Sequence, residues 1–251
     1  MDQTDKAAAT ARAEKINQAF TDISRTLVTD FDLADALDQV IGYCVSAGGA
    51  TGVGIVIEDE YGRLRDIAYS DDGVRRLERL QIETAEGPCV QSVRLGRAVV
   101  EADLLTAEDR WLRFAPAATA AGFQAVRALP LRFRSRTLGA LNLFDDNGDQ
   151  CSPELLRAAQ ALADLAVLAI VQHAHAHAHQ DATAPITRAL AGRTLIEQAK
   201  GMLAEDGHLT MQQAHDRLRD HAARTGQHTT RLAYALVHGD LSTRDLLQPQ
   251  R

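Results

Sequence analysis

The most informative stretch of the chain is residues 193–203, RTLIEQAKGML. Its apolar side chains recur every three or four residues and predict one buried helix face, made of Leu195, Ile196, Ala199, Met202 and Leu203. Arg193, Glu197 and Lys200 fall on another face of the same helix. Lys200 is one of only three lysines in an arginine-rich chain, which suggests that a compact ammonium group is needed there.

Two further helical patterns follow. Thr210 and Gln213 have the spacing of a capping box, which predicts the start of the second helix. Thr229 or Thr230 is expected to cap the third, which ends at Gly239. The inward side chains are expected to be Met211, Ala214, His215, Leu218 and Ala222, then Leu232, Ala233, Leu236 and Val237. About nine residues separate the two patterns, more than the tight turn of a DNA-binding helix-turn-helix allows. The sequence therefore predicts a small all-α three-helix bundle.

These residues resemble the ANTAR domain. The resemblance covers about residues 186–241 and rests on Arg193, the run Ile196-Glu-Gln-Ala-Lys-Gly201, Gln213-Ala214, Leu218, Ala222 and Leu232-Ala233. It implies an RNA-binding output module of a bacterial transcription antitermination regulator, acting on two hairpin loops in nascent RNA. A homodimer suits this role, because linked binding of two loops multiplies modest affinities.

The RNA-binding candidates are basic residues of this bundle. Arg193, Lys200, Arg217 and Arg224 are expected to contact phosphates or loop bases, and Gly201 to let RNA approach the helix closely. The segment from Ile186 onward has nine basic and seven acidic residues, whereas the whole chain carries −7. This charge permits RNA binding without demanding it.

The longer N-terminal part alternates helical and strand patterns. A helix is expected over 33–45, capped by Asp30 or Asp32, and a long one begins at Pro153. Another helix is expected over 108–122. Strands are expected over 52–57, 64–69, 99–100, 125–133 and 137–144. This order predicts an α+β domain with a mostly antiparallel sheet flanked by helices.

This part resembles a GAF domain of the kind fused to ANTAR domains in actinobacteria. The resemblance covers about residues 20–172 and rests on the runs Glu86-Gly-Pro-Cys89, Arg94-Leu-Gly-Arg97, Asp103-Leu104, Arg110-Trp111, Phe114-Ala115, Gly122-Phe123, Ala128-Leu-Pro-Leu131 and Leu138-Gly-Ala-Leu-Asn-Leu-Phe144. It implies a sensor of a small-molecule or redox signal that also dimerises, while the fold leaves the ligand undefined. The predicted organisation is an N-terminal helix (1–29), a GAF domain (30–180), a linker (181–185), the ANTAR domain (186–241) and a tail (242–251).

Two residues are candidates for a sensor pocket. Cys89 follows Gly87-Pro88 at a predicted helix start, where a thiol can have a lowered pKa; the alternative, which we favour, is a small buried side chain. Trp111, the only tryptophan, either stacks on a ligand or, as we favour, packs in the core. A redox enzyme such as a free methionine sulfoxide reductase is the alternative function, and it needs cysteines that meet in space. A DNA-binding regulator is the other alternative.

Other motifs give no site. Residues 145–149, DDNGD, lack the spacing of a calcium loop and predict a polar turn. His173, His175, His177 and His179 alternate with alanine, and with no further ligand nearby we interpret them as part of a helix or linker. No catalytic motif, phosphate-binding loop or dinucleotide fingerprint is found, so neither an enzyme, a metal nor a cofactor is predicted.

The composition of the chain predicts its compartment, and the N-terminal segment has a helical pattern of its own. The three cysteines lie far apart, and neither a signal peptide nor a membrane-spanning run is found, which predicts a cytoplasmic protein without a membrane partner. Ile16, Phe20, Ile23 and Leu27 have the spacing of a coiled-coil seam. This seam either pairs with a second subunit or packs back on the long helix that begins at Pro153.

Overall fold

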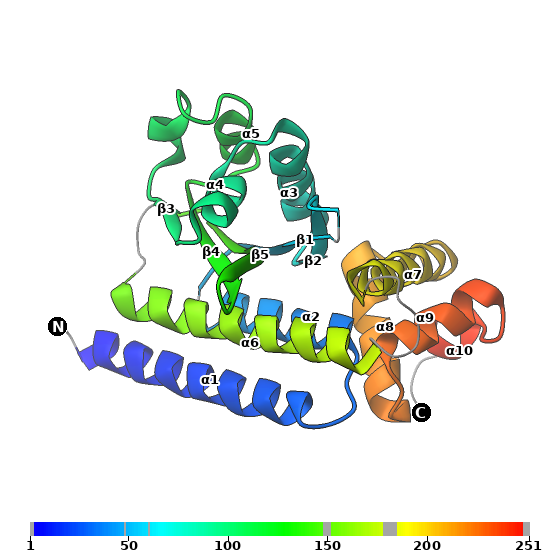
Figure 1. Ribbon diagram of the computed structural model, residues 1–251. Coiled ribbons are helices and arrows are strands. Elements are labelled where there is room, and N and C mark those ends of the chain that lie inside the picture. The colour runs from blue at the N-terminus through cyan, green and yellow to red at the C-terminus, as the bar shows by residue number, and fades with distance from the viewer. Residues whose placement is uncertain (1–2, 48, 60, 148–151, 178–184, 248–251) are drawn as a thin grey trace.

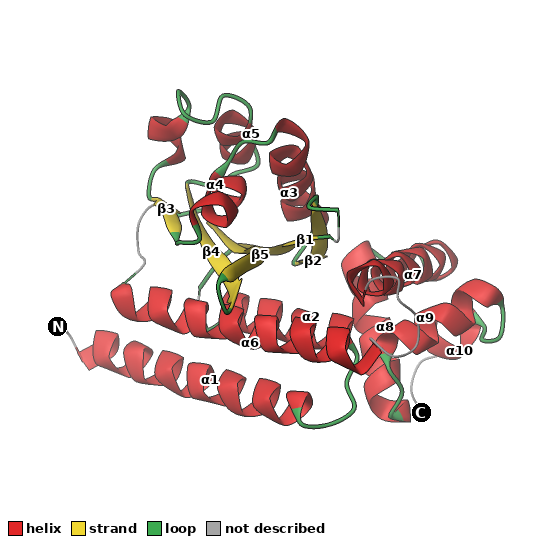
Figure 2. Ribbon diagram, in the orientation of Figure 1, coloured by secondary structure: helices red, strands yellow, loops and turns green. Residues whose placement is uncertain are grey.

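The computed structural model describes residues 3–47, 49–59, 61–147, 152–177 and 185–247. One antiparallel sheet carries helices on both faces, and a group of C-terminal helices lies beside one edge of this sandwich (Figure 1). Figure 2 shows that every strand belongs to the N-terminal part. This is the predicted α+β domain followed by an all-α region.

The sheet has the strand order β2-β1-β5-β4-β3. Its strands are β1 (Gly52–Glu58), β2 (Leu64–Tyr69), β3 (Val99–Glu101), β4 (Ala125–Phe133) and β5 (Arg136–Asp145). All neighbouring pairs are antiparallel, as predicted. β1 and β5 approach closely at Gly139, where a Cβ atom would lie 2.0 Å from the carbonyl oxygen of Val56. Only glycine fits this position.

Two helices cover one face of the sheet, α2 (Leu33–Ser46) and α6 (Pro153–His177), and α1 (Gln3–Leu27) packs on their outer side (Figure 1). Asp32 caps α2, and α6 begins at Pro153, as predicted. The seam of α1 packs back within the same chain, because Ile23 and Leu27 are buried together with residues of α2 and α6. Among the described helices, none combines the length and apolar content that spanning a membrane requires.

The other face carries α3 (Asp72–Thr84), α4 (Pro88–Leu95), the short 3-10 helix η1 (Leu104–Ala107) and α5 (Phe114–Ala120). The prediction of one helix over 108–122 is wrong at its start. α5 begins only at Phe114, which puts Pro116 in the first turn, where its missing N–H leaves no hydrogen bond unmade. The structure also contains α3, for which we predicted no range.

The C-terminal bundle contains α7 (Pro185–Gly207), α8 (Met211–Thr225), α9 (Thr229–His238) and α10 (Thr243–Leu247). Its core consists of Ile196, Ala199, Leu203, Ala214, Leu218, Ala222, Leu232, Ala233, Leu236 and Leu246. Thr210 and Gln213 form the predicted capping box, and Gly239 ends α9 in a left-handed conformation. α10 adds a short helix to the segment assigned as the tail.

Three expectations for this bundle are wrong in detail. Met202 is 38% exposed rather than part of the buried face. α9 begins after His228, and neither Thr229 nor Thr230 caps it through its side chain. Only residues 226–228 separate α8 from α9, so the length of this connection does not argue against a helix-turn-helix.

Candidate nucleic-acid interface

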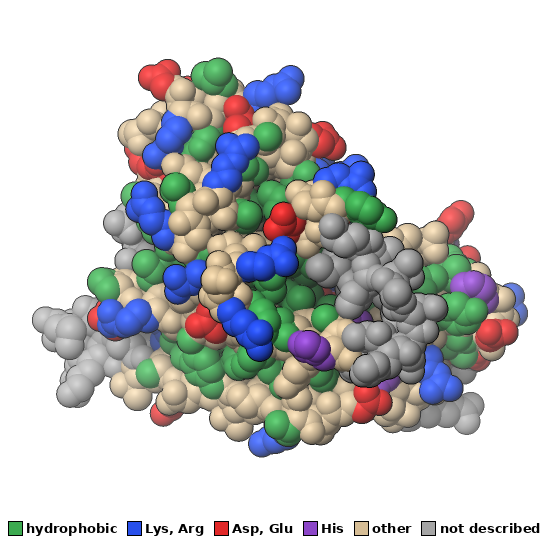
Figure 3. Space-filling model, in the orientation of Figure 1, with side chains coloured by type: hydrophobic (Ala, Val, Ile, Leu, Met, Phe, Trp, Pro, Cys, Tyr) green, Lys and Arg blue, Asp and Glu red, His purple; other side chains and the backbone are tan. Residues whose placement is uncertain are grey.

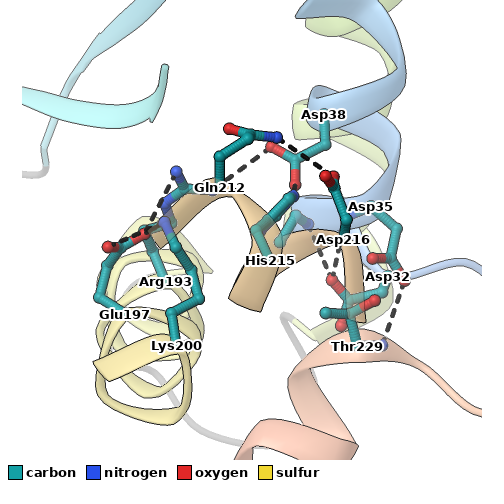
Figure 4. A network of polar contacts seen from close by, with 11 residues as sticks. Asp32, Asp35, Asp38, Arg193, Glu197, Lys200, Gln212, His215, Asp216 and Thr229 are labelled. Atoms are coloured by element: carbon teal, nitrogen blue, oxygen red, sulfur yellow. Dashed lines mark hydrogen bonds and ion pairs between the residues drawn. The ribbon is translucent and has the colours of Figure 1, made fainter. Parts of the chain in front are cut away.

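The predicted RNA-binding face of α7 is a row of paired charges. Glu197 lies one turn from both Arg193 and Lys200, and its carboxylate accepts a hydrogen bond from Lys200 Nζ at 2.9 Å. Arg193 Nη2 lies 3.4 Å from the same carboxylate. Only 8% of either basic side chain is exposed. The i, i+4 and i+7 spacing thus brings these groups together as predicted, but it does not leave them in solvent (Figure 4).

The burial comes from the N-terminal domain. Asp38, on α2, accepts a hydrogen bond from Arg193 Nη1 at 3.3 Å and lies 3.1 Å from Nε2 of His215 on α8 (Figure 4). Burial favours a raised pKa for Asp38, but the close contact with His215 and the charge of Arg193 outweigh it and lower the pKa. Asp38 is therefore an ionised carboxylate held between two helices of the bundle.

Two more contacts fix the bundle against the N-terminal domain. The guanidinium carbon of Arg193 lies 4.3 Å from the ring centroid of Tyr69, the last residue of β2, which is a cation–π contact. Asp35 accepts a hydrogen bond from the backbone N–H of Thr229 at 3.3 Å, close to the first turn of α9. Groups from α2 and β2 thus meet groups from α7, α8 and α9.

The other predicted contact residues lie elsewhere. A Cβ atom on Gly201 would meet nothing within 4 Å, so packing within the chain does not require glycine there. Arg217 and Arg224 come two and nine residues after His215, which puts both on the opposite side of α8 from His215. Arg219 lines a cleft with Arg193 and Lys200 instead. Arg219 comes four residues after His215, and this helical spacing could have predicted that the two side chains lie on the same side of α8.

Figure 3 shows one face of the described bundle. In the view of Figure 3, the C-terminal helices among the described residues carry only scattered Lys and Arg side chains. Arg193 and Lys200 are both buried, Arg193 against Asp38 of α2 and Tyr69 of β2, and Lys200 against Glu197 of its own helix. The candidate interface residues Arg193, Glu197 and Lys200 therefore lie together, but the two basic side chains are buried.

A second buried polar cluster lies between the sheet and α3. Glu78 accepts hydrogen bonds from the side-chain amides of Asn142, at 2.8 Å, and Gln81, at 3.1 Å. Gln81 in turn accepts from the backbone N–H of Cys89 at 2.9 Å. Gly54 lets Glu78 lie flat on the sheet, because a Cβ atom there would be 2.3 Å from the carboxylate. Burial raises the pKa of Glu78 to about 8.

Both candidate sensor residues are buried. Cys89 has no exposed surface, and burial together with the charge of Glu78 raises its pKa well above the ordinary value, which is the opposite of an activated thiol. Trp111 is 3% exposed and packs edge-on against Phe114, with ring centroids 5.9 Å apart. The geometry matches the small buried side chain and the core tryptophan that we favoured.

The structure gives no support to a cysteine pair or a metal site. Cys44 is a buried residue of α2, and Cys89 is buried with Val56 and Ala140 on the opposite face of the sheet, while Cys151 lies outside the described residues. Within the described ranges, no group of three or more His, Cys, Asp or Glu side chains could hold a metal. His179 and the side chain of His177 fall outside that description.

Comparison with protein families identifies both parts. The GAF domain family matches residues 32–171, more than half of the chain, and the ANTAR domain family matches residues 185–237. The chain belongs to the GAF–ANTAR regulator family. A sensory GAF domain followed by an RNA-binding ANTAR domain is the architecture of a regulator rather than an enzyme, and the candidate interface lies where the two domains meet.

Solved structures, a GAF domain among them, are similar to this chain. The GAF domain of an Acinetobacter phosphoenolpyruvate-protein phosphotransferase has 16% identity and a TM-score of 0.51, covering 72% of this chain and 100% of that one. A domain of a two-component sensor histidine kinase protein from Sinorhizobium meliloti 1021 has 14% identity and a TM-score of 0.49, covering 60% and 98%. A free methionine-R-sulfoxide reductase from Neisseria meningitidis has 16% identity and a TM-score of 0.44, covering 61% and 87%. Comparison with curated proteins finds no match.

Proposed function

We propose that this chain is a signal-responsive RNA-binding regulator that acts by transcription antitermination. The observation that carries the proposal is the Ala199-Lys200-Gly201 run in α7 of an ANTAR bundle. Lys200 supplies three donors for phosphate, and the open space beside Gly201 lets an RNA backbone approach the helix. Nascent RNA is a cytoplasmic ligand, so the proposal implies a cytoplasmic protein.

The two domains have separate roles in this proposal. The GAF domain senses a small-molecule or redox signal and dimerises, and each ANTAR bundle binds one hairpin loop of a leader transcript. Two linked bundles bind two loops with an affinity that neither has alone. Holding both hairpins excludes the terminator structure, so transcription continues.

The basic residues account for a measurable salt dependence. Arg193, Lys200, Arg217 and Arg224 are the proposed RNA contacts, and Arg219 joins them because it lines the same cleft as Lys200. If about four phosphates are neutralised, the log-log slope against salt is roughly −3, or on the order of a sixty-fold loss between 50 and 200 mM. Tyr234 is the only aromatic residue from Ile186 onward, so base stacking falls mainly to arginine planes.

The test is binding of the full-length protein to a labelled two-hairpin leader RNA from its own genome, by fluorescence anisotropy at several salt concentrations. Lys200→Ala is compared with Lys15→Ala as a matched control, because Lys15 is an exposed lysine of α1. We expect Lys200→Ala to weaken binding and to make the salt slope shallower by about one, while Lys15→Ala changes neither.

Two competitors separate the alternatives. Unrelated single-stranded RNA measures nonspecific binding, and duplex DNA tests the DNA-binding alternative. Loss of preference for the two-hairpin RNA, or equal binding by Lys200→Ala, contradicts the proposal. A preference for duplex DNA favours the alternative regulator, for which the three-residue connection between α8 and α9 leaves room.

A further inference from the structure

The docked arrangement of the two domains places opposite charges in contact. The ANTAR side contributes Arg193 and His215, and the GAF side contributes Asp38, whose side chain is only 10% exposed. Arg193 is bounded by Asp38, by its own Glu197 and by the ring of Tyr69. Both charged partners of this guanidinium are carboxylates of the chain itself, so a phosphate would have to displace one of them.

The GAF carboxylates form a row. Asp32, Asp35 and Asp38 follow one another at three-residue intervals along the first turns of α2, and Figure 4 shows them on the side that faces the bundle. Asp30, just before the helix, lies 4.0 Å from His228. A row of negative groups presented to the basic side of an RNA-binding helix imitates the charge of a phosphate backbone.

The contact between the two domains around Arg193 is incompletely packed. Clefts of about 630 Å³ and 800 Å³ lie on the two sides of Arg193, so the interface is not closely packed around it. Most residues that line the larger cleft are charged, whereas the smaller one combines charged residues with apolar ones such as Ile41, Val45 and Met211. Interfaces between domains that are polar and incompletely packed permit relative motion of the domains.

We propose that the docking of the ANTAR bundle onto α2 is autoinhibitory, with Asp38 as an internal competitor of RNA for Arg193 and the cleft that contains Lys200. The inference rests on the proposed function. The docked chain has low affinity for hairpin RNA, because the competent state is only a fraction of the population. A signal in the GAF domain raises RNA affinity by releasing the bundle.

The variant that tests this is Asp38→Asn in the full-length protein. It removes the charge on the GAF side, keeps the size of the side chain and leaves every proposed RNA contact intact. We expect RNA binding to become about tenfold tighter, the gain that follows if docking holds the competent state near one tenth of the population. Asp164→Asn, on exposed α6 surface, is the matched control and leaves binding unchanged.

A double variant keeps the two proposals apart. Lys200→Ala added to Asp38→Asn is expected to lose most of the gained affinity. If wild type and Asp38→Asn bind equally while Lys200→Ala weakens binding, the RNA function stands and autoinhibition is overturned. If none of these proteins prefers the two-hairpin RNA, the proposed function fails and the inference fails with it.

A measurement on the wild-type protein guards against a variant that folds poorly. Hydrogen–deuterium exchange across the start of α2, around Asp35 and Asp38, is followed with and without saturating two-hairpin RNA. We expect RNA to increase exchange there, because the bundle must leave α2 in order to bind. Unchanged or slower exchange on α2 in the RNA-bound protein overturns autoinhibition, whatever the variants do.

Discussion

Glu78→Gln is expected to stabilise the protein above neutral pH and to remove most of its pH dependence in that range. The carboxyl of Glu78 is fully buried between α3 and the sheet, where Asn142 and Gln81 donate to it. Ionising it leaves a charge with no basic partner within the cluster, which is why its pKa rises to about 8. Glutamine has the same shape and never ionises.

The sign and size follow from the two pKa values. The folded protein holds the Glu78 proton up to about pH 8, whereas the unfolded chain releases it near 4.5. Between these values the folded state binds more protons, so the free energy of unfolding falls as pH rises. Each pH unit in this interval lowers the free energy of unfolding by about 1.4 kcal/mol. Relative to pH 4.5, the free energy of unfolding is therefore lower by roughly 3 kcal/mol at pH 7 and by roughly 5 kcal/mol above pH 8. The buried oxygen of Asn142, which has no partner, can turn to accept from the new amide.

The assay is urea unfolding from pH 5 to pH 9, followed by the fluorescence of Trp111, which is buried in the core on the same face of the sheet as α3. Glu83→Gln, an exposed position on α3, is the control. We expect the wild type and Glu83→Gln to lose stability in parallel as pH rises, and Glu78→Gln to lose much less. Equal slopes for wild type and Glu78→Gln across this range would refute the reasoning.

Three further outcomes test the packing. Cys44 and Cys89 are expected to resist alkylation at pH 8 until denaturant is added, because both are buried and burial raises the pKa of each; peptide mapping would show early labelling if this is wrong. Gly139→Ala should lower the free energy of unfolding by about 3 kcal/mol, because its Cβ meets the backbone of Val56; a change below about 0.5 kcal/mol in urea unfolding would contradict the close approach. Thr210→Ala should cost about 1 kcal/mol through loss of the capping box, and an unchanged thermal midpoint would show that the cap is dispensable.

The sequence predicts the sheet well because strand ends are marked by local chemistry. β2 and β4 have the predicted bounds, since turn residues such as Gly62 before β2 and Ser135 after β4 mark where these strands end. It misses α3 for a physical reason. Four side chains of this helix face inward, and two of them, Glu78 and Gln81, are polar, so the apolar period on which helix prediction depends is interrupted.

The end of α8 and the start of α9 could not be predicted from the sequence for a related reason. The last turn of α8 and the first turn of α9 contribute few apolar side chains to the core, so the hydrophobic pattern stops at Ala222 and resumes at Leu232. The helices themselves continue to within three residues of each other. Apolar spacing reports where a helix is buried rather than where it ends.

The covering of the candidate interface could not be read from local sequence. Asp38 and Arg193 are 155 positions apart, and nothing near Asp38 marks it as different from the other acidic residues of α2. The pairing of Arg193 and Lys200 with Glu197 lies within α7 and involves no second domain. What the sequence lacks is the approach of a second domain, which turns a charged helix face into a buried contact.

Tyr69 gives the proposed release a route through direct contacts. Its ring is buried in the same core as Val74 and Leu77 of α3, on the face of the sheet opposite to α2, while the guanidinium of Arg193 lies against it. Arg193 is therefore held from both layers of the GAF domain, by Tyr69 from one and by Asp38 of α2 from the other. A change in packing beneath α3 moves Tyr69, and a shift of α2 moves Asp38. Either change weakens the hold on Arg193 without any group of the ANTAR bundle having to bind the signal, so a ligand inside the GAF domain can act on the RNA-binding face through contacts that already exist.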